Sequence, residues 1–223
     1  MCVTHSPYPI ALNLAQKPCL VVGGGALAEG KLDALIAAGA CLTVISPDVQ
    51  PRIADLAADG HLVLRQRPYH SDDLNGVTLV IAATEDRALN ARIAEDARAA
   101  GVLVNAVDDP PNCDFYAVSI VRRGDLQVAI STNGRSPAFA RWMRESLDVS
   151  LPAEYRDLLD LLGDIRDRIR QDGPVPPYEQ WRDAISDDVL AALRRGDRTT
   201  ARARLWEALA TPRIASAPAD VAK

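Results

Sequence analysis

The feature that most constrains this chain is a short apolar run that ends in three consecutive glycines. Leu20–Val22 leads into Gly23–Gly25, and apolar residues then recur at helical spacing. This order predicts a strand, a tight turn and a helix, with Gly23, Gly25 and Ala28 at the small positions of a G-x-G-x-x-A pattern. Gly25 has no side chain to obstruct a pyrophosphate, and a helix N-terminus favours an anion. The pattern predicts dinucleotide binding; an ordinary glycine-rich strand–turn–helix is the simpler alternative.

Apolar runs alternate with helical patterns through the first half of the chain. The runs predict strands over residues 41–45, 62–65, 78–83 and 102–107, and a further short strand is expected over residues 9–16. Helices are predicted from Pro51 to Asp59 and after Asp86. Strands that alternate with helices indicate an α/β fold with a doubly wound parallel sheet of the Rossmann type.

Ligands of such sheets lie beyond the carboxyl ends of the strands. The predicted ends are Gly23–Gly25, Ser46–Asp48, Ala83–Thr84 and Asn105–Asp108. Asp48 lies where an acid binds the adenosine ribose in dinucleotide folds, although Ser-Pro-Asp equally suits a turn or a helix cap. No arginine directly follows that strand, which favours NAD over NADP.

Few side chains at this edge can do acid–base chemistry. None of the three histidines lies at a predicted strand end, and no pair of them has the spacing of metal ligands, so no metal site is expected. Asp108 follows a buried strand beside the expected nicotinamide position, where we expect it to be partly buried and to act as a base. Asp109 is its competitor, and both also suit the turn before two prolines.

The pattern changes after Pro111. Residues 115–121 and 126–130 predict a hairpin with Arg122–Asp125 between its strands. A lone hairpin is marginal in water, so we expect it to be covered, and a partner subunit is one candidate. Ser136 is a good N-cap for a helix that runs to about residue 147, and the loop before it suits an anion as well as plain capping. Further helices are predicted over residues 152–171, 178–194 and 197–209.

Composition narrows the classes of partner. The chain has 25 basic and 30 acidic residues, a net charge of -5, which disfavours nucleic acid. No apolar run approaches the roughly 18 residues of a membrane span. Four scattered cysteines and an N-terminus without a secretory pattern predict a cytoplasmic protein. Residues 114–147 nevertheless carry five arginines against three acids, which is either scatter or a cationic wall for a polycarboxylate.

Four motifs occur in a fixed order: Val21–Ala28, Ala82–Asp86 with Asn90, Val104–Pro110 and Ser131–Ala138. Over roughly residues 8–210 their order and spacing resemble the N-terminal module of siroheme synthase, which is also found free-standing. The resemblance implies an NAD-binding Rossmann domain over residues 1–113, a small strand-containing dimerisation and substrate region over 114–147, and a helical C-terminal domain over 148–211. Residues 212–223 are expected to be a disordered tail. The resemblance also implies a homodimer with active sites built between domains and subunits.

The resemblance further implies a reaction. The family oxidises precorrin-2 to sirohydrochlorin with hydride transfer to NAD, and bifunctional members then insert ferrous iron to give siroheme. The family's catalytic aspartate falls on Asp108, which would remove protons in both steps. The cofactor-binding set is then Gly23, Gly24, Gly25, Ala26, Leu27, Pro47, Asp48, Ala83, Thr84 and Asn105. The carboxylates of the tetrapyrrole would be held by Arg122, Arg123, Ser131, Thr132, Arg135 and Ser136.

Two positions depart from the family pattern. Asn133-Gly-Arg135 stands where the family commonly has Gly-Gly-Thr, and Gly30-Lys31 where it commonly has Arg-Lys. Neither departure touches Asp108. Some relatives are dehydrogenases only, so one alternative is a dehydrogenase without chelatase activity. Two further alternatives are a non-enzymatic NAD sensor on the same fold and an unrelated small-molecule dehydrogenase.

Overall fold

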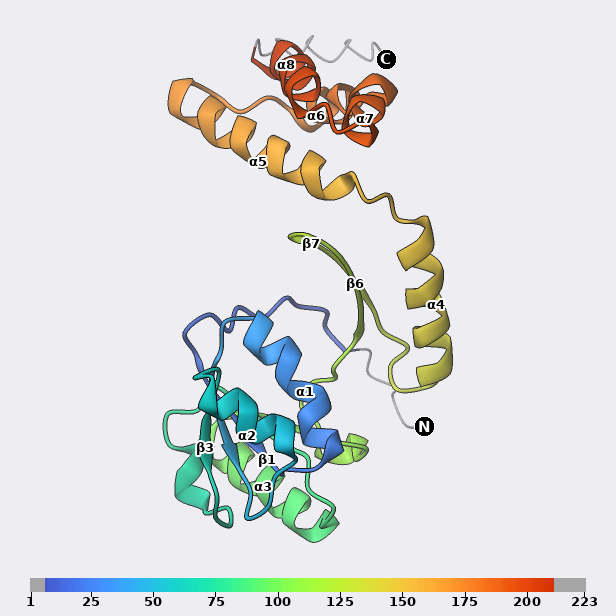
Figure 1. Cartoon of the computed structure of the whole chain (residues 1–223). Coiled ribbons are helices and arrows are strands. Elements are labelled where there is room, and N and C mark those ends of the chain that lie inside the picture. The colour runs from blue at the N-terminus through green and yellow to red at the C-terminus, as the bar shows by residue number, and fades with distance from the viewer. Residues whose placement is uncertain (1–6, 211–223) are drawn as a thin grey trace, which may run out of the picture. The chain divides into compact units, whose positions relative to one another are not determined.

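The structure is a computed structural model that describes residues 7–210, and Figure 1 labels its α-helices and several of its strands. The chain divides into two compact units between Ala117 and Val118, and each is described by itself. The predicted tail over residues 212–223 lies outside the described residues. No helix among those described is long and apolar enough to span a bilayer.

The first unit holds a five-stranded parallel sheet in the order β3-β2-β1-β4-β5. Its strands are β1 (Pro18–Val22), β2 (Cys41–Ile45), β3 (Val63–Arg65), β4 (Leu79–Ala82) and β5 (Leu103–Ala106). The connections contain α1 (Ala26–Ala37), α2 (Pro51–Ala58), η1 (Ser71–Leu74) and α3 (Arg87–Ala100), and η2 (Pro110–Asn112) follows β5. The order reverses between β1 and β4, as in dinucleotide-binding sheets. The predicted α/β fold with a Rossmann-type sheet is therefore confirmed.

The sheet is buried on both faces. Along β1, Cys19 and Val21 belong to one apolar cluster with Leu32 of α1, whereas Leu20 and Val22 belong to another that includes residues of α3. Successive side chains of a strand point to opposite faces, so a strand covered on both sides needs an unbroken apolar run. This explains why β1 and β4 read as continuous apolar runs in the sequence.

The second unit begins with an antiparallel hairpin, β6 (Ser119–Arg123) and β7 (Leu126–Ile130). It continues with α4 (Pro137–Ser150), α5 (Tyr155–Asp172), α6 (Tyr178–Ala184), α7 (Asp187–Arg194) and α8 (Arg198–Leu209). Helices α5 to α8 enclose a separate apolar core in which Ile165, Leu205 and Leu209 are almost completely buried. The predicted small strand-containing region and helical C-terminal region are both present.

Four expectations differ from the structure. Of residues 9–16, none forms a strand; instead the Asn13 side chain accepts a hydrogen bond from the Ala15 N–H (3.0 Å) and the Lys17 N–H donates to Leu14 O (2.9 Å), which makes a turn. The first hairpin strand starts at Ser119 rather than at Phe115, because Phe115 packs against the core of the first unit.

The remaining two differences concern the hairpin turn and the helix predicted over residues 178–194. Arg122 and Arg123 lie in β6 rather than in the turn, which is made by Gly124 (φ +60°) and Asp125. The helix predicted over residues 178–194 is two helices. Ser186 breaks it, because its side chain caps α7 by accepting from the Val189 N–H (3.4 Å).

Candidate functional site

The glycines of the β1–α1 turn are required by the close packing of neighbouring strand ends. Gly23 has φ +125°, and a Cβ there would lie 2.4 Å from Ala83 O. A Cβ on Gly24 would lie 2.0 Å from Asp48 O. The turn is therefore in contact with the ends of β2 and β4, and the sequence-predicted residues at these three ends come together.

Gly25 has a different role from its two neighbours. It is the N-cap of α1 without a side-chain hydrogen bond, and a Cβ built on it would meet nothing within 4 Å. Ala26 and Leu27 follow it, are exposed, and belong to the first helical turn, whose N–H groups have no acceptor within the helix. Open space in front of free N–H groups fits the pyrophosphate of a dinucleotide.

The residues after β2 are held against this turn by hydrogen bonds. The Gly23 N–H donates to Ile45 O (2.9 Å), the Gln50 N–H donates to Gly24 O (2.8 Å), and the Ser46 hydroxyl donates to Asp48 O (2.6 Å). The Ser-Pro-Asp sequence thus forms a turn, which was the alternative to a ribose-binding acid. Pro47 and Asp48 are exposed, so the Asp48 carboxylate is also accessible to a ribose.

The end of β4 is organised by a residue outside the predicted site set, Asn90 of α3. Its buried side-chain oxygen accepts from the Thr84 hydroxyl (2.7 Å) and the Thr84 N–H (3.2 Å), and its amide nitrogen donates to Thr84 O (2.9 Å). Asn90 therefore fixes the Ala83–Thr84 backbone beside the glycine turn. The sequence signal was its place in the second motif, six residues after Thr84.

Asn105 in β5 binds the chain that returns from η2. Its side-chain nitrogen donates to Phe115 O (2.8 Å) and contacts Cys113 Sγ at 3.4 Å. The side chain is buried, with 8% of the residue exposed. Among the described residues, these contacts give Asn105 a structural task, and its predicted contact with a cofactor stays a prediction.

Asp108 and Asp109 differ sharply in their surroundings. Asp109 Oδ2 accepts from Asn112 Nδ2 (2.8 Å), and Cys113 Sγ lies 3.3 Å from Asp109 O, so Asp109 builds the turn. The Asp108 carboxylate has no hydrogen-bond or ion-pair partner among residues 7–210, and the residue is exposed rather than partly buried as expected. Its φ of +59° lies in the left-handed region, which non-glycine residues rarely occupy and which is found at functional sites.

The hydroxyl loop of the second unit is held together by its own side chains. Ser131 Oγ accepts from the Asn133 N–H (3.2 Å), Thr132 Oγ1 donates to Ser136 O (3.2 Å), and Ser136 Oγ accepts from the Phe139 N–H (3.2 Å). Ser136 is therefore the N-cap of α4, as predicted. The neighbouring Arg135 is exposed.

The predicted substrate arginines have different environments. Arg123 Nε donates to Leu151 O (3.2 Å) and Arg123 Nη1 to Asp148 (2.9 Å), so this side chain secures the C-terminal end of α4. Arg122 and Arg135 are exposed, and their side chains have no ion pair with another described residue. These two guanidinium groups are therefore the ones accessible to a carboxylate ligand.

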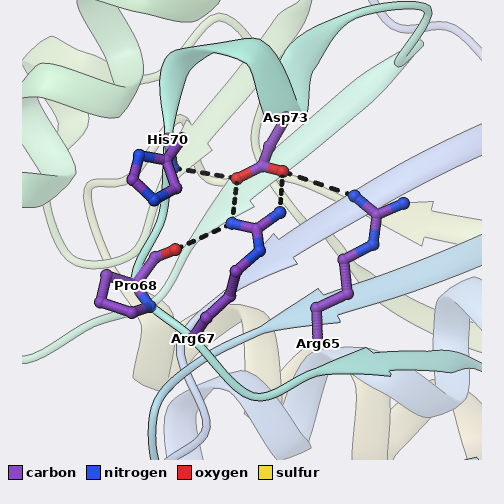
Figure 2. A network of polar contacts seen from close by, with 5 residues as sticks. All are labelled: Arg65, Arg67, Pro68, His70 and Asp73. Atoms are coloured by element: carbon purple, nitrogen blue, oxygen red, sulfur yellow. Dashed lines mark hydrogen bonds and ion pairs between the residues drawn. The ribbon is translucent and has the colours of Figure 1, made fainter.

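Sequence reasoning missed a charged network at the end of β3, drawn in Figure 2. Asp73 of η1 accepts from both terminal nitrogens of Arg67, from Arg65 Nη1 (3.4 Å) and from the His70 N–H (2.9 Å). The Asp73 side chain is only 5% exposed. The Arg67 hydrogen bonds lower the pKa of Asp73 against the opposing effect of burial, so the carboxylate is charged at neutral pH.

Two family models match most of the chain. A model described as NAD(P)-binding matches residues 10–119, and a model described as sirohaem biosynthesis protein central matches residues 123–150. The first covers the sheet and its helices, and the second covers the hairpin turn, the hydroxyl loop and α4.

Several curated proteins are similar over almost the whole chain. The siroheme synthase of Methylococcus capsulatus is 39% identical over 90% of this chain and 43% of the relative. Siroheme synthase 1 of Cronobacter sakazakii is 39% identical over 92% of this chain and 44% of the relative. The siroheme synthase of Chromobacterium violaceum is 36% identical over 96% of this chain and 45% of the relative. The chain thus spans less than half the length of these relatives.

Among solved structures, the chain is similar to one described as SirC, precorrin-2 dehydrogenase. The TM-score is 0.69 at 25% sequence identity, and the match covers 90% of this chain and 100% of the other. The similarity therefore extends over both units.

Proposed function

Because the chain belongs to the siroheme synthase N-terminal module family, we propose that it oxidises precorrin-2 to sirohydrochlorin, with NAD as the hydride acceptor. The observation that carries this proposal is the pairing of an open glycine turn with an unpartnered carboxylate on the same sheet edge. Gly25 faces space that no described residue fills, and Asp108 is held at φ +59° after β5.

The residues of the first unit fit a nicotinamide dinucleotide. Gly25, Ala26 and Leu27 would bind the pyrophosphate through backbone N–H groups at the start of α1. Asp48 would bind the ribose hydroxyls, and the Ala83–Thr84 backbone, fixed by Asn90, would support the centre of the cofactor. NAD is proposed over NADP because an acid, and no adjacent arginine, follows β2.

Oxidation of precorrin-2 removes one hydride and one proton. NAD, held at the glycine turn, would supply the hydride acceptor. Asp108 is the proposed base, and its carboxylate would take the proton that the macrocycle loses as the hydride leaves. Asp109 is unsuited to this role because its carboxylate is already engaged with Asn112. Arg122 and Arg135 would hold acetate and propionate groups of the substrate by charge-assisted hydrogen bonds.

We propose insertion of ferrous iron as a second step, supported by the relatives that carry the name siroheme synthase. Siroheme is the iron complex of sirohydrochlorin, and metal entry displaces two pyrrole protons. Asp108 would accept these protons in turn, with iron as a substrate.

A homodimer is proposed as the working form. Helix α4 of the second unit leaves large apolar side chains exposed, among them Phe139 (53%) and Trp142 (58%). Their rings lie 5.6 Å apart and form one patch. Burial of this patch against a second copy would stabilise α4 and, because α4 packs on β6, the hairpin as well. A cytoplasmic location stays a prediction.

The proposal is tested by anaerobic absorbance spectroscopy of the purified protein with precorrin-2. Sirohydrochlorin should form only when NAD is present, and added ferrous iron should then give siroheme faster than the uncatalysed reaction. Formation of sirohydrochlorin without siroheme would support the dehydrogenase step and contradict iron insertion. Bound NAD without any turnover would contradict the enzyme and favour an NAD sensor.

A further inference from the structure

We propose that Asp73 selects NAD against NADP, by holding the Arg65 and Arg67 guanidinium groups away from the 2′ position of the adenosine ribose. The inference deepens the proposed function, because it takes the β1–α1 turn as a dinucleotide site. It assigns a task to the network of Figure 2, which the proposed reaction does not otherwise use.

The network lies one strand away from the expected ribose position. Ile45 of β2 pairs in register with Arg65 of β3, and the Ser46 N–H donates to Arg65 O (3.3 Å). Ser46 in turn begins the turn that presents Asp48. The adenosine half of a dinucleotide occupies this side of the switch point between β1 and β4, so Arg65 borders its ribose.

The two arginines are held with unequal strength. Arg67 binds Asp73 with both terminal nitrogens, whereas Arg65 makes a single longer contact of 3.4 Å through Nη1. The Arg65 side chain is 51% exposed, against 36% for Arg67. Arg65 is therefore the cation that would bind a 2′-phosphate if Asp73 lost its charge.

An arginine beside the ribose is the feature by which dinucleotide sites accommodate the 2′-phosphate of NADP. Here the buried carboxylate of Asp73 neutralises one of the two cations and anchors both. The exposed Asp48 carboxylate is the proposed partner of the same ribose. A 2′-phosphate would have to displace Asp73 from Arg65 while being repelled by both acids. A 2′-hydroxyl meets neither cost.

The simpler explanation is that Asp73 only ties η1 to β3. The two explanations separate when 5′-AMP and 2′,5′-ADP are compared as probes, because these nucleotides differ only in the 2′-phosphate. Binding is measured by calorimetry on the full chain without any tetrapyrrole. Asp73→Asn keeps an oxygen for Arg67 and for the His70 N–H but removes the charge.

We expect Asp73→Asn to bind 2′,5′-ADP about tenfold more tightly than the unmodified chain, with 5′-AMP binding unchanged. Adding Arg65→Gln to Asp73→Asn should return 2′,5′-ADP binding to its original strength. Arg52→Gln is the matched control, because Arg52 is also ion-paired, to Asp33 (2.6 Å), and follows the same β2 loop. It should leave the ratio of the two affinities unchanged.

If Asp73→Asn does not fold, Arg65→Glu tests the placement alone, and it should weaken 2′,5′-ADP binding about tenfold with little effect on 5′-AMP. Normal 5′-AMP binding with an unchanged affinity ratio in these variants would overturn the inference and leave the proposed function standing. Failure of the unmodified chain to bind either 5′-AMP or NAD would overturn the proposed cofactor site and the inference together.

Discussion

At the residue scale, two adjacent aspartates of one turn have opposite environments. Asp109 is bound to Asn112, whereas Asp108 is exposed, unpartnered among the described residues and held in the left-handed region. Backbone conformations of this kind cluster at functional sites, which makes Asp108 the candidate of the two. The assignment of Asp108 as the base depends on this contrast and on the family.

Asp108→Asn should lower the rate of sirohydrochlorin formation by about 10²- to 10⁴-fold, because it removes the proposed proton acceptor. NAD affinity should not change, since the substitution leaves the glycine turn intact. The measurement is steady-state turnover alongside NAD titration, with Asp109→Asn as the matched control. Near-normal turnover of Asp108→Asn would contradict the assigned role.

The backbone of Asp108 predicts a stability difference between two variants that both lack the carboxylate. Asparagine tolerates the left-handed conformation and alanine does not, so Asp108→Ala should be about 1 kcal/mol less stable than Asp108→Asn. Urea unfolding of the two proteins measures the difference. Equal midpoints at equal slopes would mean that φ +59° carries no cost at this position.

Much of this site could be predicted from the sequence, because its signals are local. The glycine spacing predicted the turn, and the positions of Asp48 and Ala83 followed from the ends of apolar runs. The network of Arg65, Arg67 and Asp73 could not be predicted in this way. Its arginines and its acid read as surface charges in the sequence, and only the pairing of β3 with β2 brings Arg65 beside the expected ribose position.

At the element scale, the three glycines of the β1–α1 turn divide into two that pack and one that stays open. Gly23 and Gly24 allow the ends of β4 and β2 to approach, and Gly25 leaves space in front of α1. Boundaries were harder to predict where a single side chain decides them. Ser186 splits one predicted helix into α6 and α7 by capping the second, and Phe115 stays with the first core instead of starting the hairpin.

Gly24→Ala should therefore mainly lower stability, whereas Gly25→Ala should mainly weaken NAD binding. A Cβ on Gly24 would lie 2.0 Å from Asp48 O, so this variant should lose about 3 kcal/mol of stability. A Cβ on Gly25 meets nothing within 4 Å, so this variant should lose under about 1 kcal/mol but bind NAD at least tenfold more weakly. Thermal unfolding and NAD titration of both variants provide the measurements. Full NAD affinity in Gly25→Ala would argue against a pyrophosphate at the turn.

At the scale of the whole molecule, the chain has two units with separate apolar cores. The predicted cofactor residues all lie in the first unit, and the predicted substrate residues, including Arg122 and Arg135, lie in the second. Sequence periodicity predicted the elements of both units. It could not predict that α5 to α8 would enclose a core of their own. An apolar stripe shows that one face of a helix is buried, but not which helix it packs against.

The division predicts where NAD protects the backbone. Saturating NAD should slow amide hydrogen exchange in the glycine turn, after β2 and after β4, because a ligand that binds the native state suppresses local opening. Exchange in α7 and α8 should change little. The measurement is hydrogen exchange by mass spectrometry with and without NAD. Protection confined to α7 and α8 would place the nucleotide elsewhere.

The stoichiometry of a single anaerobic turnover is the most direct test of the proposed reaction. Purified protein is mixed with precorrin-2 and NAD, and the absorbances of NADH and of sirohydrochlorin are followed together. We expect one NADH for each sirohydrochlorin, and neither product when NAD is omitted. Sirohydrochlorin that forms without matching NADH, or NAD that binds without any conversion of precorrin-2, would contradict the assignment of this chain as a precorrin-2 dehydrogenase.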